Sequence, residues 1–291
     1  MIPSNDLSLR VHSAQLNKVT SIATEQQNPV SDDTFINELS NEFKTCLGGD
    51  EFRPINQYDN LLNMLSEFKV LSYTHFKSGN YTLRFDYVFF HKTSYVTIEK
   101  SQGAGALPIS RKLEFISSNI QDLQKILIST SVQKLRDGMT AWGNSVNAGA
   151  SDVVKNNVNI ALEKMLDCCS IDKKTLDLSN LQLSSLPPLP EWIEVLSVYH
   201  NKLTKIQVPE LCKELSASFN ELTVFPEVPD NIIRISVANN KISYIASFPS
   251  KAEIILIGHN NLSEIPAIPD TTKIFSCSYN NIKKLHTSRR I

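Results

Sequence analysis

The chain has 291 residues, of which 41% are hydrophobic, and this composition excludes wholesale disorder and allows one or two globular units. Lys and Arg number 29 and Asp and Glu number 30, so no basic excess points to nucleic acid. The sequence contains no polybasic run and no apolar run approaching the ~18–20 residues of a membrane span, so membrane association is not indicated.

Residues 1–32 are predicted to be a disordered leader, because twelve of the first thirty residues are Ser, Thr, Asn or Gln and no long apolar stretch marks a Sec signal peptide. Residues 33–118 are predicted to form a small α+β domain. Two helices are expected in DDTFINELSNEFKTCL and YDNLLNMLSEFKVLSY, and three strands in NYTLRFDYVFF, SYVTIEK and RKLEFIS. The sequence GAGALP, residues 103–108, is the expected linker.

Residues 119–173 are predicted to contain a further linker and a helical N-terminal cap for the segment that follows. The first helix is expected from Ser131 to Gly143 and the second from Asp152 to Cys169, with Ser151 as the N-cap of the second. A helical hairpin of this kind covers the apolar end that a stack of repeats otherwise exposes.

Asparagines recur at intervals of 19, 20, 20 and 20 residues in the last third of the chain, and apolar residues recur at fixed offsets around them. These asparagines are Asn201, Asn220, Asn240, Asn260 and Asn280. The pattern LxLxxNxLxxLP is that of leucine-rich repeats. It predicts that residues 174–286 form a leucine-rich-repeat solenoid of about six units, with short parallel strands and an extended convex side. The asparagine amides both donate and accept, so they are expected to form a structural ladder along the turns.

The exposed strand positions of the repeats predict a concave surface that binds protein. When the repeats are aligned, two of the exposed strand positions hold mostly small neutral residues. The position just before each asparagine holds mostly residues with rings, which are favoured anchors at protein interfaces. The residues expected to contact a partner are Tyr199, His200, Phe219, Asn239, His259 and Tyr279. The alternative is a solvated rim with no partner.

Catalytic and metal-binding patterns are not apparent in the sequence. The two histidines of the ring column are three repeats apart, roughly 14 Å at the usual spacing of strands, which is too far for one zinc ion. No catalytic residue, cofactor, metal or small-molecule substrate is therefore expected. The five cysteines are odd in number and lie within apolar patterns, so free buried thiols are expected. They are Cys46, Cys168, Cys169, Cys212 and Cys277.

Three stretches carry a resemblance to a known family. They are the proline-punctuated repeats LSSLPPLP and VFPEVPDNI, the junction MLDCCSIDKKTLDLSNLQLSSLPPLP, and the helical hairpin AWGNSVNAGASDVVKNNVNIALEKML. With these motifs the chain resembles the secreted leucine-rich-repeat effectors of Gram-negative pathogens, the group of the IpaH-type ubiquitin ligases and YopM. Residues 33–100 also resemble the N-terminal secretion and localisation domain of the Salmonella members.

The resemblance implies a virulence effector that a type III secretion system delivers into the host cell, to the cytoplasm or the nucleus. It implies host proteins as partners of the concave repeat face and a secretion chaperone as a partner of the N-terminal region. In the ligase members a domain after the repeats carries a Cys-x-Asp thioester motif. No cysteine here is followed two residues later by Asp, so ligase activity is not expected of this chain. The alternative is a truncated or split E3 ubiquitin-protein ligase effector in which this chain is the substrate-recognition half.

Overall fold

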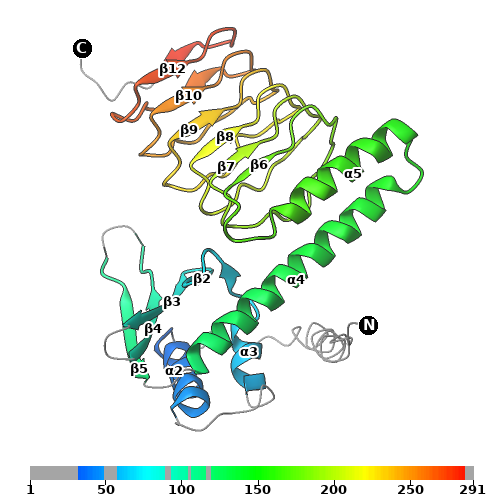
Figure 1. Cartoon of the computed structure of the whole chain (residues 1–291). Coiled ribbons are helices and arrows are strands. Elements are labelled where there is room, and N and C mark those ends of the chain that lie inside the picture. Colours follow the sequence, from blue (N-terminus) through cyan, green and yellow to red (C-terminus); the bar gives the residue numbers. More distant parts are fainter. Residues whose placement is uncertain (1–31, 49–57, 89–92, 104–105, 116–118, 286–291) are drawn as a thin grey trace.

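The computed structural model describes residues 32–48, 58–88, 93–103, 106–115 and 119–285, which form an α+β unit and a solenoid joined by a long helix (Figure 1). The predicted fold class, an α+β domain followed by a capped parallel-strand solenoid, is confirmed. The predicted disordered leader lies outside the described residues, except for its last position.

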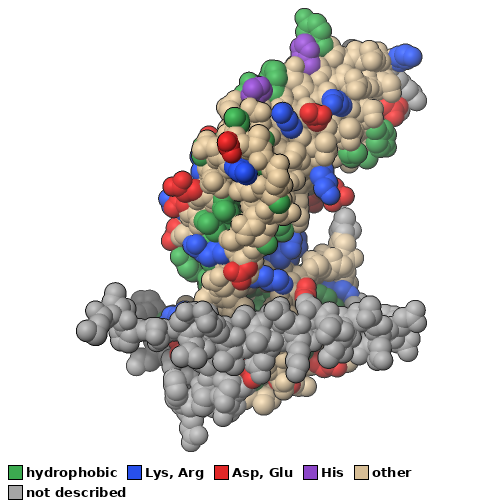
Figure 2. Space-filling view, turned by 90° about the vertical axis from the view of Figure 1, so that its right-hand side faces the viewer, with side chains coloured by type: hydrophobic (Ala, Val, Ile, Leu, Met, Phe, Trp, Pro, Cys, Tyr) green, Lys and Arg blue, Asp and Glu red, His purple; other side chains and the backbone are tan. Residues whose placement is uncertain are grey.

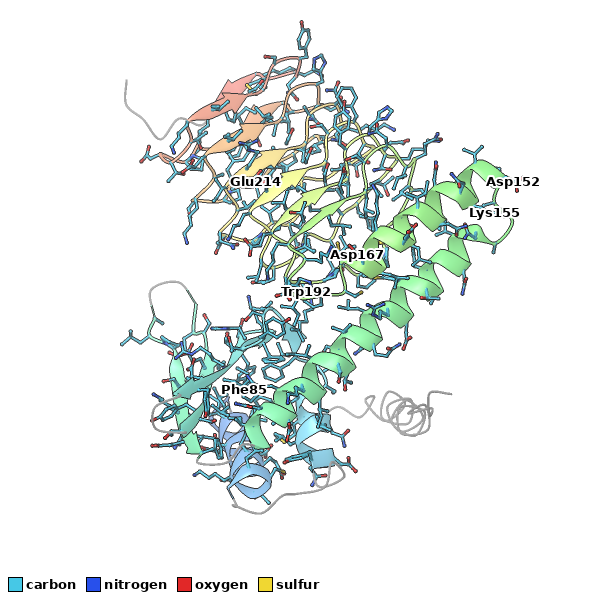
Figure 3. The ribbon with its side chains drawn as sticks, in the orientation of Figure 1. Phe85, Asp152, Lys155, Asp167, Trp192 and Glu214 are labelled. Atoms are coloured by element: carbon cyan, nitrogen blue, oxygen red, sulfur yellow. The ribbon has the colours of Figure 1, made fainter. Side chains whose placement is uncertain are left out.

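The N-terminal unit packs two helices on an antiparallel sheet of five strands in the order β1-β2-β3-β4-β5. Alternation along the third strand buries Leu83 and Phe85, which face Phe43 from the first helix. Figure 3 shows Phe85 inside this unit. The elements are α2 (Asp32–Leu47), α3 (Asp59–Leu65), β1 (Lys69–Val70), β2 (His75–Ser78), β3 (Tyr81–Val88), β4 (Thr93–Lys100) and β5 (Ile109–Phe115).

Two features of this unit differ from the prediction. The second helix ends at Leu65, and the rest of its predicted span enters the hairpin of β1 and β2. A two-residue strand is too short to produce an alternating pattern, so this hairpin was not predicted. The expected linker, residues 103–108, instead lies between β4 and β5, which are neighbours in the sheet. Its glycines therefore belong to a connection within the unit.

Helix α4 (Asn119–Asn147) is more than twice as long as the helix predicted from Ser131. The prediction of a linker in the first part of this range is wrong, because Ile120, Leu123 and Leu127 are buried and continue the apolar stripe toward the N-terminus. No glycine or proline interrupts residues 119–137, so nothing in the chain breaks the helix there. Its N-terminal half packs on the α+β unit and its C-terminal half on the next helix (Figure 1).

Helix α5 (Asp152–Asp167) follows the prediction closely and completes the hairpin. Val158, Ala161 and Met165 are buried on its inner face, and Ser151 precedes it in an extended conformation without a side-chain capping bond. Gly143 of α4 lies opposite Leu162 of α5, where a Cβ atom would stand 3.2 Å from the leucine side chain. Glycine at that position therefore permits the close approach of the two helices. None of the helices among the described residues is long and apolar enough to cross a bilayer.

The solenoid contains a six-stranded parallel sheet in the order β12-β10-β9-β8-β7-β6. Equivalent repeat positions pair directly: Leu196 lies opposite Leu215, and Ile235 lies opposite Ile255. The repeat period of the sequence therefore determines the register in which the strands pair. The strands are β6 (Thr175–Asp177), β7 (Val195–Ser197), β8 (Glu214–Ser216), β9 (Arg234–Ser236), β10 (Ile254–Leu256) and β12 (Ile274–Ser276), and a second small sheet pairs β11 (Glu264–Ile265) with β13 (Lys284–Leu285).

The last proline of each unit begins a tight turn just before the next strand. The carbonyl of Pro190, for example, accepts a hydrogen bond from the amide of Ile193, and Pro209 and Pro229 do the same three residues ahead. Proline lacks an amide hydrogen, so it leaves no unpaired donor at the start of this turn. The residue after the proline projects at the outer corner of the turn, and it is glutamate in the first two of these turns.

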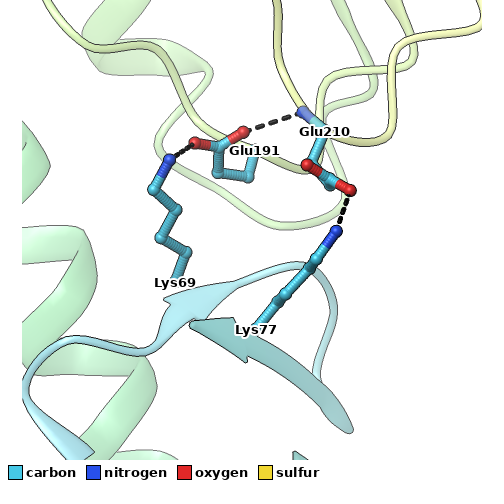
Figure 4. Close-up of polar contacts among 4 residues, drawn as sticks. All are labelled: Lys69, Lys77, Glu191 and Glu210. Carbon is cyan, nitrogen blue, oxygen red and sulfur yellow. Dashed lines mark hydrogen bonds and ion pairs between the residues drawn. The ribbon is translucent and has the colours of Figure 1, made fainter. Parts of the chain in front are cut away.

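Those two glutamates hold the α+β unit against the solenoid (Figure 4). Lys69 donates to Glu191 at 2.5 Å, and Lys77 forms an ion pair with Glu210. The second carboxylate oxygen of Glu191 accepts the backbone amide of Glu210 at 2.8 Å, which ties the two pairs together. The hairpin of β1 and β2 therefore binds the first two turns of the solenoid through charge-assisted hydrogen bonds.

A buried tryptophan fixes the junction between the helical hairpin and the first repeat. Trp192 is fully buried, and its indole N–H donates to the carbonyl of Cys168 just beyond α5 at 3.2 Å. Figure 3 places it where the solenoid meets the rest of the molecule. Trp142 of α4 also donates to the first repeat, to the hydroxyl of Ser185 at 3.1 Å. Buried indole groups find hydrogen-bond partners in this way, and they orient the hairpin on the repeats.

Reversing one charge at the contact between the units is expected to loosen it. Lys77→Glu would bring two carboxylates together, and we expect faster amide hydrogen exchange in β2, measured by mass spectrometry. Because both partners of this pair are partly exposed, the change in the free energy of unfolding should stay within about 1 kcal/mol. The double variant Lys77→Glu/Glu210→Lys should restore the slow exchange, and unchanged exchange in the single variant would contradict the role of this contact.

Candidate functional site

A ladder of asparagine amides determines the shape of the solenoid edge beyond the strands. Asn240 donates to the carbonyls of Val237 and Ala238 in its own unit, at 3.0 and 3.2 Å, and to Ala217 in the preceding unit at 3.0 Å. Its side-chain oxygen accepts the amide of Leu222 at 3.0 Å. One side chain therefore bonds four backbone groups: it supplies the acceptor for the Leu222 amide, and it shares the three carbonyls with donors of the neighbouring units.

The same contacts recur along the stack. Asn220 and Asn260 are buried and repeat every bond made by Asn240, at equivalent positions in their own and preceding units. Asn201 also bonds the first unit, in which Leu181 occupies the asparagine position. Asn280, in the last of these units, makes the same bonds but is only half-buried. The ladder thus connects consecutive turns through buried hydrogen bonds.

The residue before each asparagine adopts a left-handed backbone conformation. The φ angles are 54° at His200, 58° at Phe219, 54° at Asn239, 53° at His259 and 57° at Tyr279. Asn and His tolerate this region better than bulky residues do, and for a phenylalanine or tyrosine such a φ is uncommon. The conformation costs about 1–3 kcal/mol per residue, so it persists only because the surrounding ladder fixes the turn.

These residues, together with Tyr199, form a row of rings along one rim of the solenoid, which we call the ring row. Figure 2 shows histidine and hydrophobic side chains following this rim from unit to unit. Phe219 and Tyr279 are 43% and 76% exposed. The strands end at Ser197, Ser216 and the equivalent residues, just before the ring row. The ring row therefore lies at the carboxyl edge of the sheet and borders the concave strand face. The prediction had placed these residues on the strands themselves.

The rings of the row form two clusters separated by Asn239. Tyr199 and Phe219 meet edge to face with ring centres 5.3 Å apart, and His200 approaches Phe219 at 6.2 Å. Further along, His259 stacks on Tyr279 at 4.1 Å with an interplanar angle of 14°. Such pairs hold exposed rings in one orientation and reduce the entropy that binding would cost.

The surface beside the ring row is small and neutral. Hydroxyl groups from successive units bond in pairs, Ser179 with Ser197 at 2.7 Å and Ser218 with Ser236 at 2.8 Å. A carboxylate stands at one end, where hydrogen bonds from Ser179 hold the pKa of Asp177 below its ordinary value. Asp177 is therefore ionised at neutral pH.

Charged residues flank this surface as ion pairs between neighbouring units. On the strand side, Lys213 pairs with Glu194 at 2.5 Å and Lys273 with Glu253 at 2.8 Å. Beyond the asparagines, Lys241 pairs with Glu221 at 2.8 Å and lowers the pKa of that carboxyl group. The charges near the ring row thus largely neutralise one another, and each exposed pair adds little stability.

The first repeat extends the ring row by polar residues that the sequence prediction did not include. Asn180 and Gln182 also have positive φ angles, 61° and 53°, and the side chain of Asn180 bonds the ring of His200 at 3.0 Å. The signal was present in the sequence, because Asn180 immediately precedes Leu181, which occupies the asparagine position of the ladder. Alignment of the first unit therefore could have identified it.

The cysteines of the chain are free, and four of them are buried, with Cys277 half-buried. Burial raises the pKa of the Cys212 thiol to about 11, and it also raises the pKa values of Cys168 and Cys169. Thiols of this kind are poor nucleophiles at neutral pH. Among the described residues, no group of three or more His, Cys, Asp or Glu side chains is placed to hold a metal ion.

Comparison with known proteins relates the N-terminal part and the repeats to different relatives. Residues 1–110 match a family of unknown function, DUF5503. A curated relative, the uncharacterized protein YedM of Escherichia coli strain K12, is 48% identical over 104 residues, which cover 34% of this chain and 90% of YedM.

Solved structures similar to the chain include leucine-rich-repeat proteins. YopM, a leucine-rich effector protein from Yersinia pestis, is 25% identical with a TM-score of 0.49, covering 54% of this chain and 44% of that one. A Shigella effector LRR domain is 26% identical with a TM-score of 0.38, covering 48% of this chain and 71% of that one. The chain thus spans less than half the length of the YopM structure.

Removing one rung of the ladder is expected to destabilise the solenoid strongly. Asn240→Ala leaves the buried Leu222 amide without its side-chain acceptor and removes one donor from carbonyls of two consecutive units, so we expect the free energy of unfolding to fall by about 2–4 kcal/mol. Urea unfolding followed by circular dichroism measures this. The matched control is the neighbouring exposed Asn261→Ala, for which a loss below about 0.5 kcal/mol is expected. Equal losses in the two variants would show that the ladder is not what stabilises these turns.

Proposed function

We propose that this chain, which belongs to the DUF5503 family of unknown function, acts as a protein-binding module whose ring row and adjoining concave face hold a partner protein. The observation that carries the proposal is the ring row itself. Two of its members, Phe219 and Tyr279, are bulky residues in a backbone conformation that Asn or Gly would occupy at lower cost. Strained positions of this kind cluster at functional sites.

The chemistry of the ring row suits a protein surface. Its rings are exposed yet held by neighbouring rings, so they provide rigid apolar contact area at a small entropic cost. The hydroxyl and amide groups beside them offer donors and acceptors for a polar rim. Because nearby charges are paired within the solenoid, the partner need not be strongly charged at this site.

We further propose that the chain is an effector delivered by a type III secretion system and that the partner is a host protein. The support for delivery is the resemblance of the repeats, the junction and the helical hairpin to secreted leucine-rich-repeat effectors. In this proposal the N-terminal region serves secretion, with a chaperone as its partner, and the repeats select the target in the host cell.

Truncating the rings is expected to weaken partner binding while leaving the fold intact. Phe219→Ala and Tyr279→Ala should each reduce affinity at least about tenfold, because large aromatic anchors dominate the energy of protein interfaces. The measurement is capture of host proteins by the immobilised chain, followed by titration of the captured partner.

Tyr87→Ala serves as the matched control, because Tyr87 is an exposed aromatic residue of the α+β unit, outside the repeats. Binding should survive that change. A partner that binds the Tyr279→Ala and Phe219→Ala variants as tightly as the natural chain would contradict the assignment of the ring row.

Export provides a separate test of delivery. We expect the full chain, fused at its C-terminus to an adenylate cyclase reporter, to raise cyclic AMP in host cells only when the bacterium has a functional type III ATPase. Deleting residues 1–31 should abolish the signal, since the proposal assigns them the secretion role. A cyclic AMP signal that does not depend on the ATPase would refute type III delivery. It would leave the proposal of partner binding unaffected.

A further inference from the structure

The convex side of the solenoid carries an open groove of about 580 Å³ between the loop after β8 and the loop after β9. Residues 224–230 form one wall and residues 244–250 form the other. We call this feature the convex groove. It lies on the return side of the repeats, away from the ring row, which follows the strand ends.

The convex groove lies where one unit carries alanine at a position that proline occupies in both neighbouring units. The loop after β8 has Pro226 and Glu227 at this position and the next, whereas the loop after β9 has Ala246 and Ser247. The prolines resume at Pro266 in the next unit. Ala246 and Ser247 are both exposed and line the groove.

Apolar side chains form part of the rim and floor of the convex groove. Val224 and Tyr244 are 70% and 59% exposed, although the equivalent positions in the flanking units hold the charged residues Lys205 and Glu264. Beneath them, Phe225 and Phe248 meet edge to face with ring centres 6.1 Å apart. Exposed apolar groups gathered around a depression mark an interaction site more often than isolated ones do.

The groove also carries unpaired negative charge. Glu227 and Asp230 line it and are exposed, and within the described part of the chain neither has a cationic partner. Asp230 occupies the turn position, directly after the last proline of its unit, that Glu191 and Glu210 hold in earlier units. Those two glutamates each bind a lysine of the N-terminal unit (Figure 4), so this turn position has the geometry to accept a basic side chain.

From these observations we propose that the convex groove binds an extended peptide segment of a partner protein that contains proline and a basic side chain. Aromatic-lined grooves favour proline-rich segments because their extended conformation is preformed and little entropy is lost on binding. In this arrangement the prolines pack on Val224 and Tyr244, and the basic side chain forms an ion pair with Asp230 or Glu227. The site is separate from the ring row and does not depend on the function proposed for it.

The test uses the full chain and a fluorescein-labelled peptide of repeated Pro-Leu-Pro-Arg units, with binding measured by fluorescence anisotropy. Ser247→Trp fills the groove and Asp230→Lys reverses its charge, and each should weaken binding at least about tenfold. The matched control is Ala267→Trp, which places the same side chain at the equivalent position one unit further on. Ala267→Trp and Tyr279→Ala should both retain binding.

A peptide in which glutamate replaces arginine should bind at least about tenfold more weakly, because the groove is acidic. Circular dichroism shows whether Ser247→Trp has disturbed the fold, and the exposed Asp230→Lys variant tests the groove independently. The proposal is overturned if the arginine peptide does not bind saturably, if the glutamate peptide binds as well, or if Ala267→Trp is as harmful as Ser247→Trp. Self-association that Ser247→Trp abolishes would also overturn it, since a second copy would then occupy the groove.

Discussion

The solenoid depends on one requirement, that the backbone groups buried where each strand ends must find hydrogen-bond partners. An unpaired buried amide or carbonyl costs about 1–3 kcal/mol, and several such groups occur in every unit. A single asparagine per unit satisfies them and joins its own turn to the preceding one, as the bonds of Asn240 to Ala217 and Leu222 illustrate. The sequence therefore repeats with the same period as these hydrogen bonds. The apolar residues at fixed offsets from each asparagine fill the space enclosed by the turns.

The ladder also determines the chemistry of the rim. Because the chain must turn sharply before each asparagine, the preceding residue is held at positive φ and its side chain is displayed at the edge of the sheet. The fold requires the conformation but not a ring, since Asn239 occupies the same position in the middle unit at lower cost. The rings at Phe219 and Tyr279 are thus a departure from what stability alone favours. This mismatch between local preference and residue identity supports the proposal that the ring row recognises a partner.

The repeats were predictable from sequence because their signal recurs. Leu196, Leu215 and Ile235 mark one column, and the pairing of the strands follows the same alignment. Features that occur once were harder to predict. The hairpin of β1 and β2 leaves almost no alternating pattern. The first half of α4 was expected to be a linker, whereas the burial of Leu123 against the α+β unit stabilises it as helix. The contact of Lys69 with Glu191 joins residues far apart in the chain, so no local pattern reveals it.

The convex groove could not be predicted for a different reason, which concerns how repeats generate function. In a solenoid each unit contacts its neighbours, so a local deviation from the consensus is exposed on the surface at a known place and is not absorbed by a shared core. Tyr244 stands where other units carry Lys205 and Glu264, and it is exposed in a groove that also holds Asp230, which has no cationic partner among the described residues. The regular positions build the scaffold, and the irregular ones supply chemistry.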